Sequence, residues 1–468
     1  MTANAQTTLP LLAAALFLGS CARTEERPEA TTTMNGSSAP YASAADWIGR
    51  EAIPFSPESG PSLDNAVDRL AGDLGGEVEL LGFGEALHGG EEILLLRNRL
   101  FRRLAEAHGF SAIAVESSCP RSRLVDAYVA GRGPASYDAV REKGFSHGFG
   151  ALEANRELVE WMRSYNADPA HPLKLRFYGF DSPTEMTGTE SPRGLIAFVL
   201  DYLDAVGGGS GSGRRERIEE LLGRDADWEN PAAMMDPSQS IGLSPAAAAL
   251  RIETEDLIAE LSRRRPELTE EGGADRFAEA LHYAGMALSL LGYHAAMARD
   301  AEDRISVGLG LRDAMMAENL DYALRRERER GRVLAFAHNM HLQRSLARWQ
   351  LGPQLLTWWP AGAQLGERLG RRYAVIGTAI GVSEANGIGR PEAGTLEALL
   401  TAGPSAGLFI PTRRGGALSP AALDAFPVRT ASARNQSYFA LAPRSLSDFD
   451  WLAVLDATGY SRGGPPLP

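Results

Sequence analysis

Short apolar runs alternate with longer helical stretches along most of this sequence, and this alternation limits the possible folds more than any other feature. Runs typical of buried strands occupy 78–83, 111–115, 173–180, 332–337 and 373–378. The stretch at 91–107 repeats leucine and phenylalanine at helical spacing. Because parallel strands need helical crossovers, the pattern predicts an α/β fold with a three-layer α/β/α core and a mainly parallel sheet.

The rhythm changes in the middle of the chain. Residues 183–300 contain several helical stretches and a Gly/Ser run at 207–213, but no convincing strand. We therefore expect a helical insertion or subdomain at 183–300, within an α/β core formed by 46–182 and 301–468. Further helices are expected at 121–130, 151–165 and 309–328, and strands near 406–410 and 451–455.

The N-terminus has the pattern of an export signal. Residues 11–19 are apolar, too short to span a bilayer but long enough for the core of a secretory signal, and they lead into Leu18-Gly19-Ser20-Cys21. This resembles the bacterial lipobox, so we expect a lipoprotein signal peptide at 1–21, lipidation of Cys21 and a flexible tether at 22–45. An ordinary cleaved signal or a misassigned start is the alternative. The lipobox predicts an extracytoplasmic lipoprotein, anchored in a membrane on the periplasmic or cell-surface side.

Charge and cysteine content exclude some partners and crosslinks. The formal net charge of −13 is spread along the chain, and no basic run has the length expected for nucleic-acid binding. Nucleic acid is therefore not an expected partner. Cys119 is the only cysteine besides Cys21, so lipidation of Cys21 would leave no pair for an intramolecular disulfide.

Ionisable side chains follow the ends of four predicted strands. Ligands bind beyond the carboxyl ends of the strands in an open parallel sheet, because the connecting loops converge there. Such a concentration of acids and histidines predicts an active site at this rim, with Asp181 in contact with the substrate. In strand order these residues are Glu85 with His88, Glu116, Asp181, and His338 with His341.

Each of these residues also has a purely structural interpretation. His88 could bond to the main chain, and Glu85, Glu116 and Asp181 could cap helices. Arg97, about two turns into the helix after the first loop, could form an exposed ion pair. The spacing of His338 and His341 also suits a metal site. The other histidines lie away from the predicted strand ends and are expected to be structural: His108, His147, His171, His282 and His294.

Two short motifs imitate better-known sites. Gly459-Tyr460-Ser461-Arg462-Gly463 matches the G-x-S-x-G pattern of a serine nucleophile, but the Gly/Pro tail after it cannot form the helix that this motif requires. Gly82-x-Gly84 follows a predicted strand, but Leu87 stands where a dinucleotide-binding motif has its third glycine. Neither motif is therefore expected to function as its pattern suggests.

The segment Gly84-Glu85-Ala86-Leu87-His88-Gly89 is similar to the G-E-x-x-H-G loop of the erythromycin esterase family, which the chain resembles. Further matching motifs are Val115-Glu116-Ser117, Arg176-Phe177-Tyr178-Gly179-Phe180-Asp181, Arg312-Asp313-Ala314-Met315-Met316-Ala317-Glu318-Asn319 and Ala337-His338-Asn339-Met340-His341. The resemblance implies a three-layer α/β core with a helical part beside it. It also implies ester hydrolysis, of a macrolactone in the resistance enzymes, with His88 as catalytic base. Positions 85, 97, 116, 338 and 341 are expected in the same pocket.

Three hypotheses follow for the function. In the first, neutral His88 activates water to cleave a carboxylic ester or (macro)lactone without a covalent intermediate or cofactor. Glu85 or Glu116 would orient the imidazole, while Arg97 and a protonated His338 or His341 would stabilise the oxyanion. In the second, Zn²⁺ or Mn²⁺ is held by His338, His341 and Glu116. In the third, the chain is a non-catalytic envelope protein that binds a small ligand.

Overall fold

The computed structural model describes residues 41–58, 60–185, 188–206 and 213–464. The predicted signal peptide, Cys21 and most of the predicted tether lie outside the described residues. Folded structure begins with helix α1 (Ala44–Glu51), and its Trp47 is completely buried. The described residues from 41 onwards belong to one compact unit.

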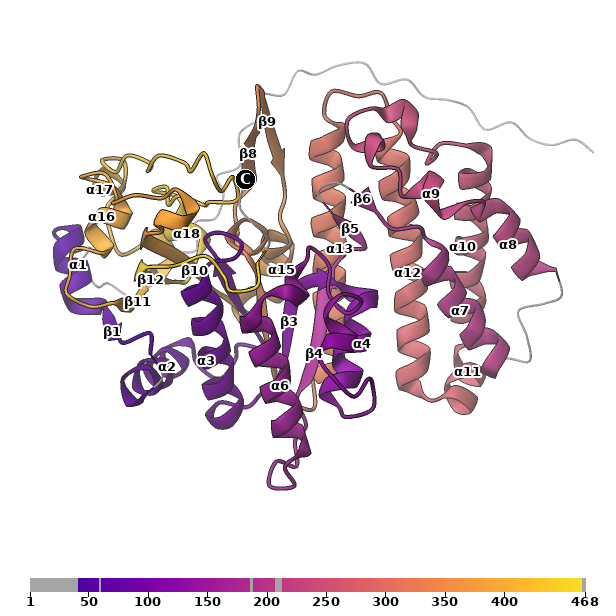
Figure 1. Ribbon diagram of the computed structural model, residues 1–468, viewed down its shortest axis with the longest axis horizontal. Coiled ribbons are helices and arrows are strands. Elements are labelled where there is room, and N and C mark those ends of the chain that lie inside the picture. The colour runs from indigo at the N-terminus through magenta and orange to yellow at the C-terminus, as the bar shows by residue number, and fades with distance from the viewer. Residues whose placement is uncertain (1–40, 59, 186–187, 207–212, 465–468) are drawn as a thin grey trace, which may run out of the picture. The chain divides into compact units, whose positions relative to one another are not determined.

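An eight-stranded sheet forms the centre of this unit (Figure 1). Strand β11 runs antiparallel to both of its neighbours, and the other neighbouring strands pair in parallel. The predicted α/β fold with a mainly parallel sheet is thus confirmed. In spatial order the strands are β1 (Ile53–Phe55), β11 (Gly407–Pro411), β12 (Trp451–Ala457), β10 (Tyr373–Val382), β2 (Leu80–Glu85), β7 (Arg332–His338), β3 (Phe110–Ser118) and β4 (Arg176–Asp181).

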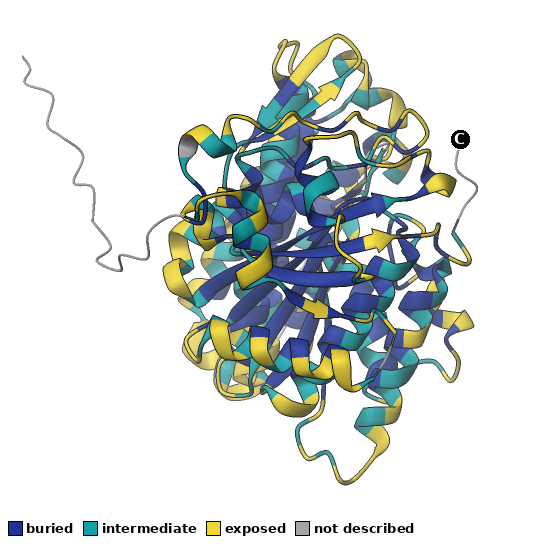
Figure 2. Cartoon of the chain, turned by 90° about the vertical axis from the view of Figure 1, so that its left-hand side faces the viewer, coloured by how far each residue is buried: buried dark blue, intermediate teal, exposed yellow. Residues whose placement is uncertain are grey.

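Helices cover both faces of the sheet, and alternate side chains of each strand face opposite helical layers. In β7, for example, Leu334 and Phe336 join one apolar cluster, whereas Val333 and Ala335 join the other. Figure 2 shows the buried strands between helices whose outer faces are exposed. One layer contains α2 (Pro61–Leu74), α3 (Glu91–Ala107), α4 (Cys119–Val129) and α6 (Glu153–Ala167); the other contains α1, α13 (Arg304–Glu327), α14 (Asn339–Leu342), α15 (Ala361–Leu369), α16 (Leu396–Leu400) and α18 (Ser445–Asp448).

The helices between β4 and α13 have an apolar cluster of their own. The described part of 183–300 adds no strand to the main sheet, and its only strands are the two-residue β5 (Thr184–Glu185) and β6 (Gly188–Thr189). Helix α12 lies beside α13 and so connects this helical part to the sheet layers (Figure 1). The helices are α7 (Arg193–Val206), α8 (Arg214–Leu222), α9 (Asp225–Trp228), α10 (Pro245–Arg263), α11 (Arg265–Gly272) and α12 (Ala274–Met297).

Individual elements agree with the sequence to different degrees. The helix predicted at 91–107 is confirmed with its bounds, whereas the first strand begins later than predicted and continues to Glu85. The sequence predicts neither β1 nor the hairpin of β8 (Ala347–Leu351) and β9 (Gln354–Trp358). None of the described helices has the length and apolar character needed to cross a bilayer.

Candidate active site

The loop after β2 holds a histidine–glutamate pair. Glu85 is the last residue of β2, and its Oε1 lies 2.7 Å from His88 Nδ1. The contact assigns the proton to Nδ1, and Nε2 has no hydrogen-bond partner among the described residues. The His88 side chain is 36% exposed, whereas that of Glu85 is only 3% exposed. The pair therefore presents one basic ring nitrogen to solvent, supported by a buried carboxylate.

Burial and charge act in opposite directions on this pair. Burial raises the pKa of Glu85 above its ordinary value, although the His88 ring counteracts it. Burial acts to lower the pKa of His88, but the Glu85 carboxylate outweighs it and the pKa of His88 is raised. The neighbouring carboxylate therefore stabilises the imidazolium that forms when His88 accepts a proton.

Two glycines determine the path of this loop. A Cβ at Gly84 would lie 2.2 Å from Asn339 Oδ1, and the Asn339 amide is held by two hydrogen bonds to the main chain of Thr378. Gly89 has a φ of +77°, and a Cβ there would lie 2.9 Å from the Tyr460 ring. Position 84 requires glycine because Asn339 lies too close for a side chain. Position 89 requires it because of the positive φ and because the Tyr460 ring leaves no room for a Cβ.

The C-terminal part of the chain holds the same loop from another side. Ser437 Oγ accepts a hydrogen bond from the His88 main-chain N–H at 3.0 Å and donates to Asn435 Oδ1 at 2.6 Å. The Phe439 N–H donates to the Ala86 carbonyl at 2.7 Å. The segment 435–439, for which the sequence predicts no element, thus positions the backbone of His88.

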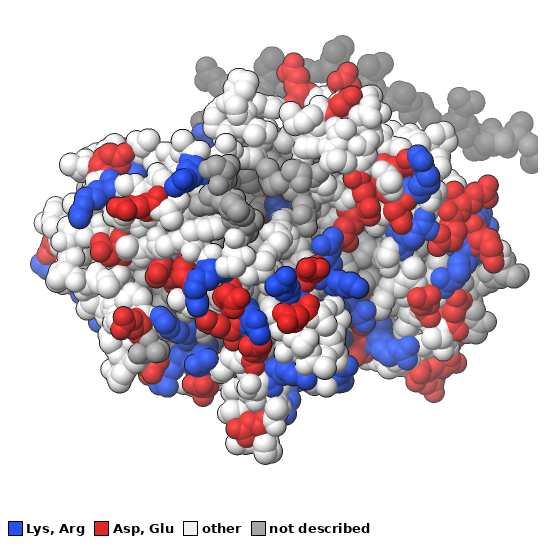
Figure 3. All heavy atoms as spheres, viewed as in Figure 1, with Lys and Arg blue, Asp and Glu red and all other residues white. Residues whose placement is uncertain are grey.

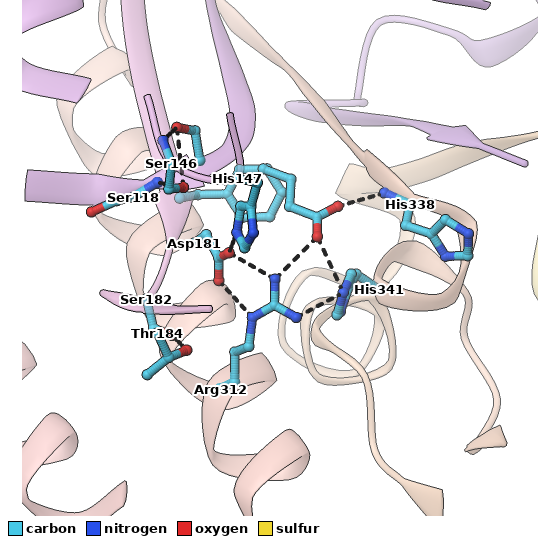
Figure 4. Close-up of polar contacts among 12 residues, drawn as sticks. Ser118, Ser146, His147, Asp181, Ser182, Thr184, Arg312, His338 and His341 are labelled. Atoms are coloured by element: carbon cyan, nitrogen blue, oxygen red, sulfur yellow. Dashed lines mark hydrogen bonds and ion pairs between the residues drawn. The ribbon is translucent and has the colours of Figure 1, made fainter. Parts of the chain in front are cut away.

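Arg312 of α13 joins the acidic groups of two strands (Figure 4). Its Nε and Nη2 donate to the two carboxylate oxygens of Asp181 at 2.9 and 2.7 Å, and Nη2 also donates to Glu116 Oε1 at 3.1 Å. His147 Nε2 lies 2.7 Å from Asp181 Oδ2. Burial acts to raise the pKa of Asp181, but Arg312 and His147 outweigh it and lower that pKa. Asp181 is therefore an ionised group that holds Arg312 in place.

Glu116 lies where strand β3 is irregular, because the register with β4 shifts between Val115 and Ser118. Its Oε2 accepts the main-chain N–H of His338 at 2.8 Å, and its Oε1 lies 3.3 Å from His341 Nε2. Burial acts to raise the pKa of Glu116, but nearby positive charge, led by His341, holds it well below its ordinary value. Glu116 is thus a fixed anion between cationic groups.

His341 is held as a cation by two acids. Its Nδ1 lies 2.9 Å from Oδ1 of the buried Asp313, which also accepts hydrogen bonds from Trp358 Nε1 and the Ala361 N–H. Burial acts to lower the pKa of His341, but Asp313 and Glu116 outweigh it and raise the pKa to about 10. The His341 ring is therefore an imidazolium at neutral pH.

His338 has the opposite character. Its Nε2 lies 2.7 Å from the Ser437 carbonyl oxygen, and its Nδ1 accepts the Met340 N–H at 3.2 Å. These partners assign a neutral ring with the proton on Nε2. Burial, and then the neighbouring His88, lower the pKa of His338 to about 3. Of the two histidines expected to stabilise charge in protonated form, His341 fits that role and His338 does not.

A single cavity of about 510 Å³ brings these groups together. The ring centroids of His88 and His338 are 5.0 Å apart, although the two residues are far apart in the sequence. The β8–β9 hairpin contributes Trp349, Leu351 and Trp358 to the wall. The ionisable part of the wall consists of His88, Glu116, His147, Arg312, His338, His341 and Tyr460, and further apolar residues are Phe149, Leu152, Leu309 and Met340.

The sequence from residue 105 to residue 458 matches the family model described as Erythromycin esterase. The chain belongs to the erythromycin esterase family. An Escherichia coli protein named erythromycin esterase type II is 25% identical over 347 residues, which cover 71% of this chain and 76% of the relative.

Solved structures share the fold of this erythromycin esterase family member. A Bacillus cereus protein has a TM-score of 0.69 at 18% identity, over 90% of this chain and 98% of its own. An erythromycin esterase mutant in its open conformation has a TM-score of 0.61 at 18% identity, over 88% of this chain and 98% of its own.

Like Asp181, which was expected to contact the substrate, Arg97 has no exposed surface. It is 0% exposed, does not line the cavity, and donates from Nε and Nη2 to Asn98 Oδ1 at 3.0 and 2.7 Å. Its guanidinium lies 4.6 Å from the centroid of the Phe336 ring. Burial lowers the pKa of Arg97 to about 10, and Glu85 partly offsets this effect. Arg97 therefore acts on Glu85 from within the protein instead of facing a substrate.

The residues that could hold a metal differ from those suggested by spacing. Glu85, His88 and Glu116 each offer a ligand atom, and these atoms lie within 4.8 Å of one another. In the set expected from the sequence, both ring nitrogens of His338 and of His341 already contact protein groups. A divalent ion would therefore fit Glu85, His88 and Glu116 better than the set expected from the sequence.

Arg312, His147 and Ser437 line the cavity, although none was expected in the site. Arg312 had a detectable signal, because it shares a four-residue spacing with the buried Met316 and Leu320 on α13. His147 has a φ of +57°, which is uncommon for a residue other than glycine. No sequence pattern predicts this backbone conformation of His147 or the contact of Ser437 with His88.

Proposed function

We propose that the protein is a carboxylic ester hydrolase in which His88 activates a water molecule for direct attack on an ester or lactone carbonyl. The observation that carries the proposal is the His88–Glu85 contact of 2.7 Å, which leaves Nε2 at a cavity wall. Membership of the erythromycin esterase family supports ester hydrolysis as the reaction class. A positioned general base contributes about 10²–10⁴ to a rate.

The proton transfers follow from the tautomer of His88. Nε2 accepts a proton from water as the water oxygen attacks the carbonyl carbon, and Glu85 stabilises the imidazolium through Nδ1–H. When the tetrahedral intermediate collapses, the bond to the leaving oxygen breaks and the proton on His88 is available to that oxygen. The products are a carboxylic acid and an alcohol, and His88 returns to its neutral form.

Charge stabilisation of the oxyanion is assigned to Arg312, whose Nη1 contacts no carboxylate, and to the positive charge of His341, whose two ring nitrogens already face Asp313 and Glu116. Both residues line the cavity, and Arg312 Nη1 lies 3.4 Å from His341 Nε2. The Asp313 carboxylate keeps His341 protonated, and Asp181 fixes the guanidinium by two hydrogen bonds. Two cationic groups that are held before the reaction need little reorganisation as negative charge develops.

Direct attack by water agrees with the hydroxyl groups around the cavity. Tyr460 is the other hydroxyl-bearing residue of the wall, and Ser437 is the only serine, threonine or cysteine among the described residues that line it. Its Oγ is engaged with the His88 main-chain N–H and with Asn435, and no hydrogen bond joins it to the His88 ring. Activation of a nucleophile requires hydrogen-bond contact with its base, which Ser437 lacks.

The wall of the cavity favours an ester with an apolar body. The hairpin contributes Trp349, Leu351 and Trp358 to the wall, and other segments contribute Phe149 and Met340. These apolar side chains lie beside the ionisable groups: the ring centroids of Phe149 and His88 are 5.6 Å apart. Burial of apolar surface would position such a substrate, while the polar groups orient its carbonyl. Macrolactones and smaller esters with bulky apolar groups belong to this class.

The experiment is a hydrolysis screen of short-chain aryl esters, simple lactones and a macrolactone, with wild-type protein and His88→Asn. We expect turnover of at least one class and a loss of at least about 100-fold in the variant. His108→Asn is the matched control, because His108 Nε2 also contacts a carboxylate, Asp68 Oδ1 at 2.8 Å, outside the cavity. Comparable turnover by the His88 variant, or inertness towards the whole screen, would contradict the proposal.

A further inference from the structure

A second cavity, of about 1190 Å³, lies between α12 and α13 and reaches the start of β4. It is lined by Arg176, the first residue of β4, whereas Asp181 of the active site is the last residue of that strand. The two cavities therefore lie towards opposite ends of the strand. We call this second cavity the arginine groove because of the side chains that line it.

Positive charge predominates in the arginine groove, although the chain as a whole is acidic with a net charge of −13. Two of its acids are engaged by arginines: Asp275 contacts Arg326 at 3.3 Å, and Glu318 contacts Arg368 at 2.7 Å. The basic lining residues are Arg176, Arg265, Arg325, Arg326, Arg328 and Arg330, and the acidic ones are Asp275, Glu318 and Glu329. Arg176 and Arg330 both contact the buried Glu327, at 3.3 and 3.0 Å. The excess of positive charge in the groove therefore comes from the remaining arginines.

Three of these arginines have no ionic partner among the residues that the structure describes. Arg265, Arg325 and Arg328 are exposed, and none of them forms an ion pair within the described part of the chain. A guanidinium presents a planar set of donors that matches the oxygens of a phosphate group. Three guanidinium groups that line one groove offer more N–H donors than a chloride ion or a single carboxylate can accept. A phosphate group, with more acceptor oxygens, matches them better.

The inner wall of the groove is suited to an organic group. The rings of His282 and Tyr322 stack with centroids 4.1 Å apart and an interplanar angle of 2°, and Phe277 and Leu281 add apolar surface. His282 Nε2 is buried and has no hydrogen-bond partner among the described residues. Because that nitrogen is enclosed, the stacked rings would offer the organic part of a ligand an apolar surface and not a hydrogen bond.

From this combination we propose that the arginine groove binds a phosphate ester. The phosphate would lie among Arg265, Arg325 and Arg328, and its apolar or aromatic group would lie against Tyr322 and His282. The ligand is a soluble phosphate ester or the headgroup of an anionic phospholipid, which share this chemistry. The site is separate from the ester-hydrolysis centre, so it does not depend on the function proposed for that centre.

The test measures binding of phenyl phosphate and inorganic phosphate to the full chain by isothermal titration calorimetry. We expect saturable binding with one site, tighter for phenyl phosphate because of the aromatic wall. Arg325→Gln and Arg328→Gln should each weaken binding about tenfold, since each removes a charge-assisted contact. Arg390→Gln is the matched control: Arg390 is also exposed, forms no ion pair among the described residues and lies outside the groove.

A vesicle arm distinguishes the two sources of the phosphate. Co-sedimentation with phosphatidylglycerol vesicles but not phosphatidylcholine vesicles, lost in Arg325→Gln, would assign a lipid headgroup. Binding of phenyl phosphate without co-sedimentation would assign a soluble ester. The proposal is overturned if neither probe binds, or if Arg325→Gln and Arg328→Gln bind as tightly as Arg390→Gln.

Discussion

Replacing Glu85 by glutamine would separate the two contributions of this residue to the reaction. The substitution keeps the size of the side chain and leaves a carbonyl oxygen for His88 Nδ1–H, but it removes the negative charge 2.7 Å from the ring. Hydrogen bonds to charged groups contribute about 1.5–3 kcal/mol and neutral ones about 0.5–1.5 kcal/mol. The difference, about 1–1.5 kcal/mol, predicts a loss of about tenfold in kcat/KM, and more if the amide turns its NH₂ towards the ring.

The pH profile gives a second and independent readout of Glu85→Gln. His88 acts as a base only when neutral, so activity rises with pH through the pKa of His88. That pKa is raised in the wild-type protein, because Glu85 outweighs the effect of burial. Without the carboxylate the effect of burial gains weight, and the acid limb of kcat/KM should move to lower pH.

The assay is kcat/KM for an aryl ester between pH 4 and about 9, for wild type, Glu85→Gln and Asp68→Asn. Asp68 is the control, because it forms the corresponding contact with His108 away from the cavity. Asp68→Asn should leave both the rate and the acid limb unchanged. An acid limb that stays in place or moves to higher pH in Glu85→Gln would refute the reasoning.

Four further predictions concern the frame of the site, its dependence on metal and the lipid anchor. Gly84→Ala should lower the free energy of unfolding in urea by about 1–3 kcal/mol, because its Cβ would lie 2.2 Å from Asn339 Oδ1, whereas Gly49→Ala, with no atom within 4 Å, should not. Arg312→Gln should destabilise the protein by about 3–5 kcal/mol, since it leaves buried carboxylates without their cation; a stability change below 1 kcal/mol, roughly that of a surface pair, would contradict this. Treatment with EDTA should leave ester hydrolysis unchanged, and a loss restored by Zn²⁺ or Mn²⁺ would show a metal requirement. Cys21→Ser should move the protein from the membrane fraction to the soluble fraction when expressed in bacteria; retention in the membrane would contradict the predicted lipid anchor.

Part of the site could be located from the sequence because parallel strands deliver their carboxyl ends to one edge. Glu85 and His338, for example, are register partners at the carboxyl ends of the parallel strands β2 and β7. Helix α3 was predictable with its bounds, because its apolar stripe and its polar face both repeat over 17 residues. For these strands and this helix, the periodicity of the sequence agrees with the place of the element in the fold.

The remaining parts depend on contacts between distant segments, which leave no local pattern. Ser437 has its role only because the C-terminal segment folds back over the loop that carries His88. The β8–β9 hairpin was missed because its strands are short and only partly buried. Spacing gives the place of Arg97 on α3, but it does not show that the side chain is enclosed against Phe336 and lies outside the cavity lining.

The central claim is that water attacks the carbonyl directly, with His88 as base and no acyl–enzyme intermediate. Rapid mixing of excess aryl ester with the protein, followed by acid quench and intact-mass analysis, tests this claim most directly. The account predicts linear product release without a burst and an enzyme of unmodified mass at every time point. A burst equal to the enzyme concentration, with an acyl group found on Ser437 or any other residue, would contradict it.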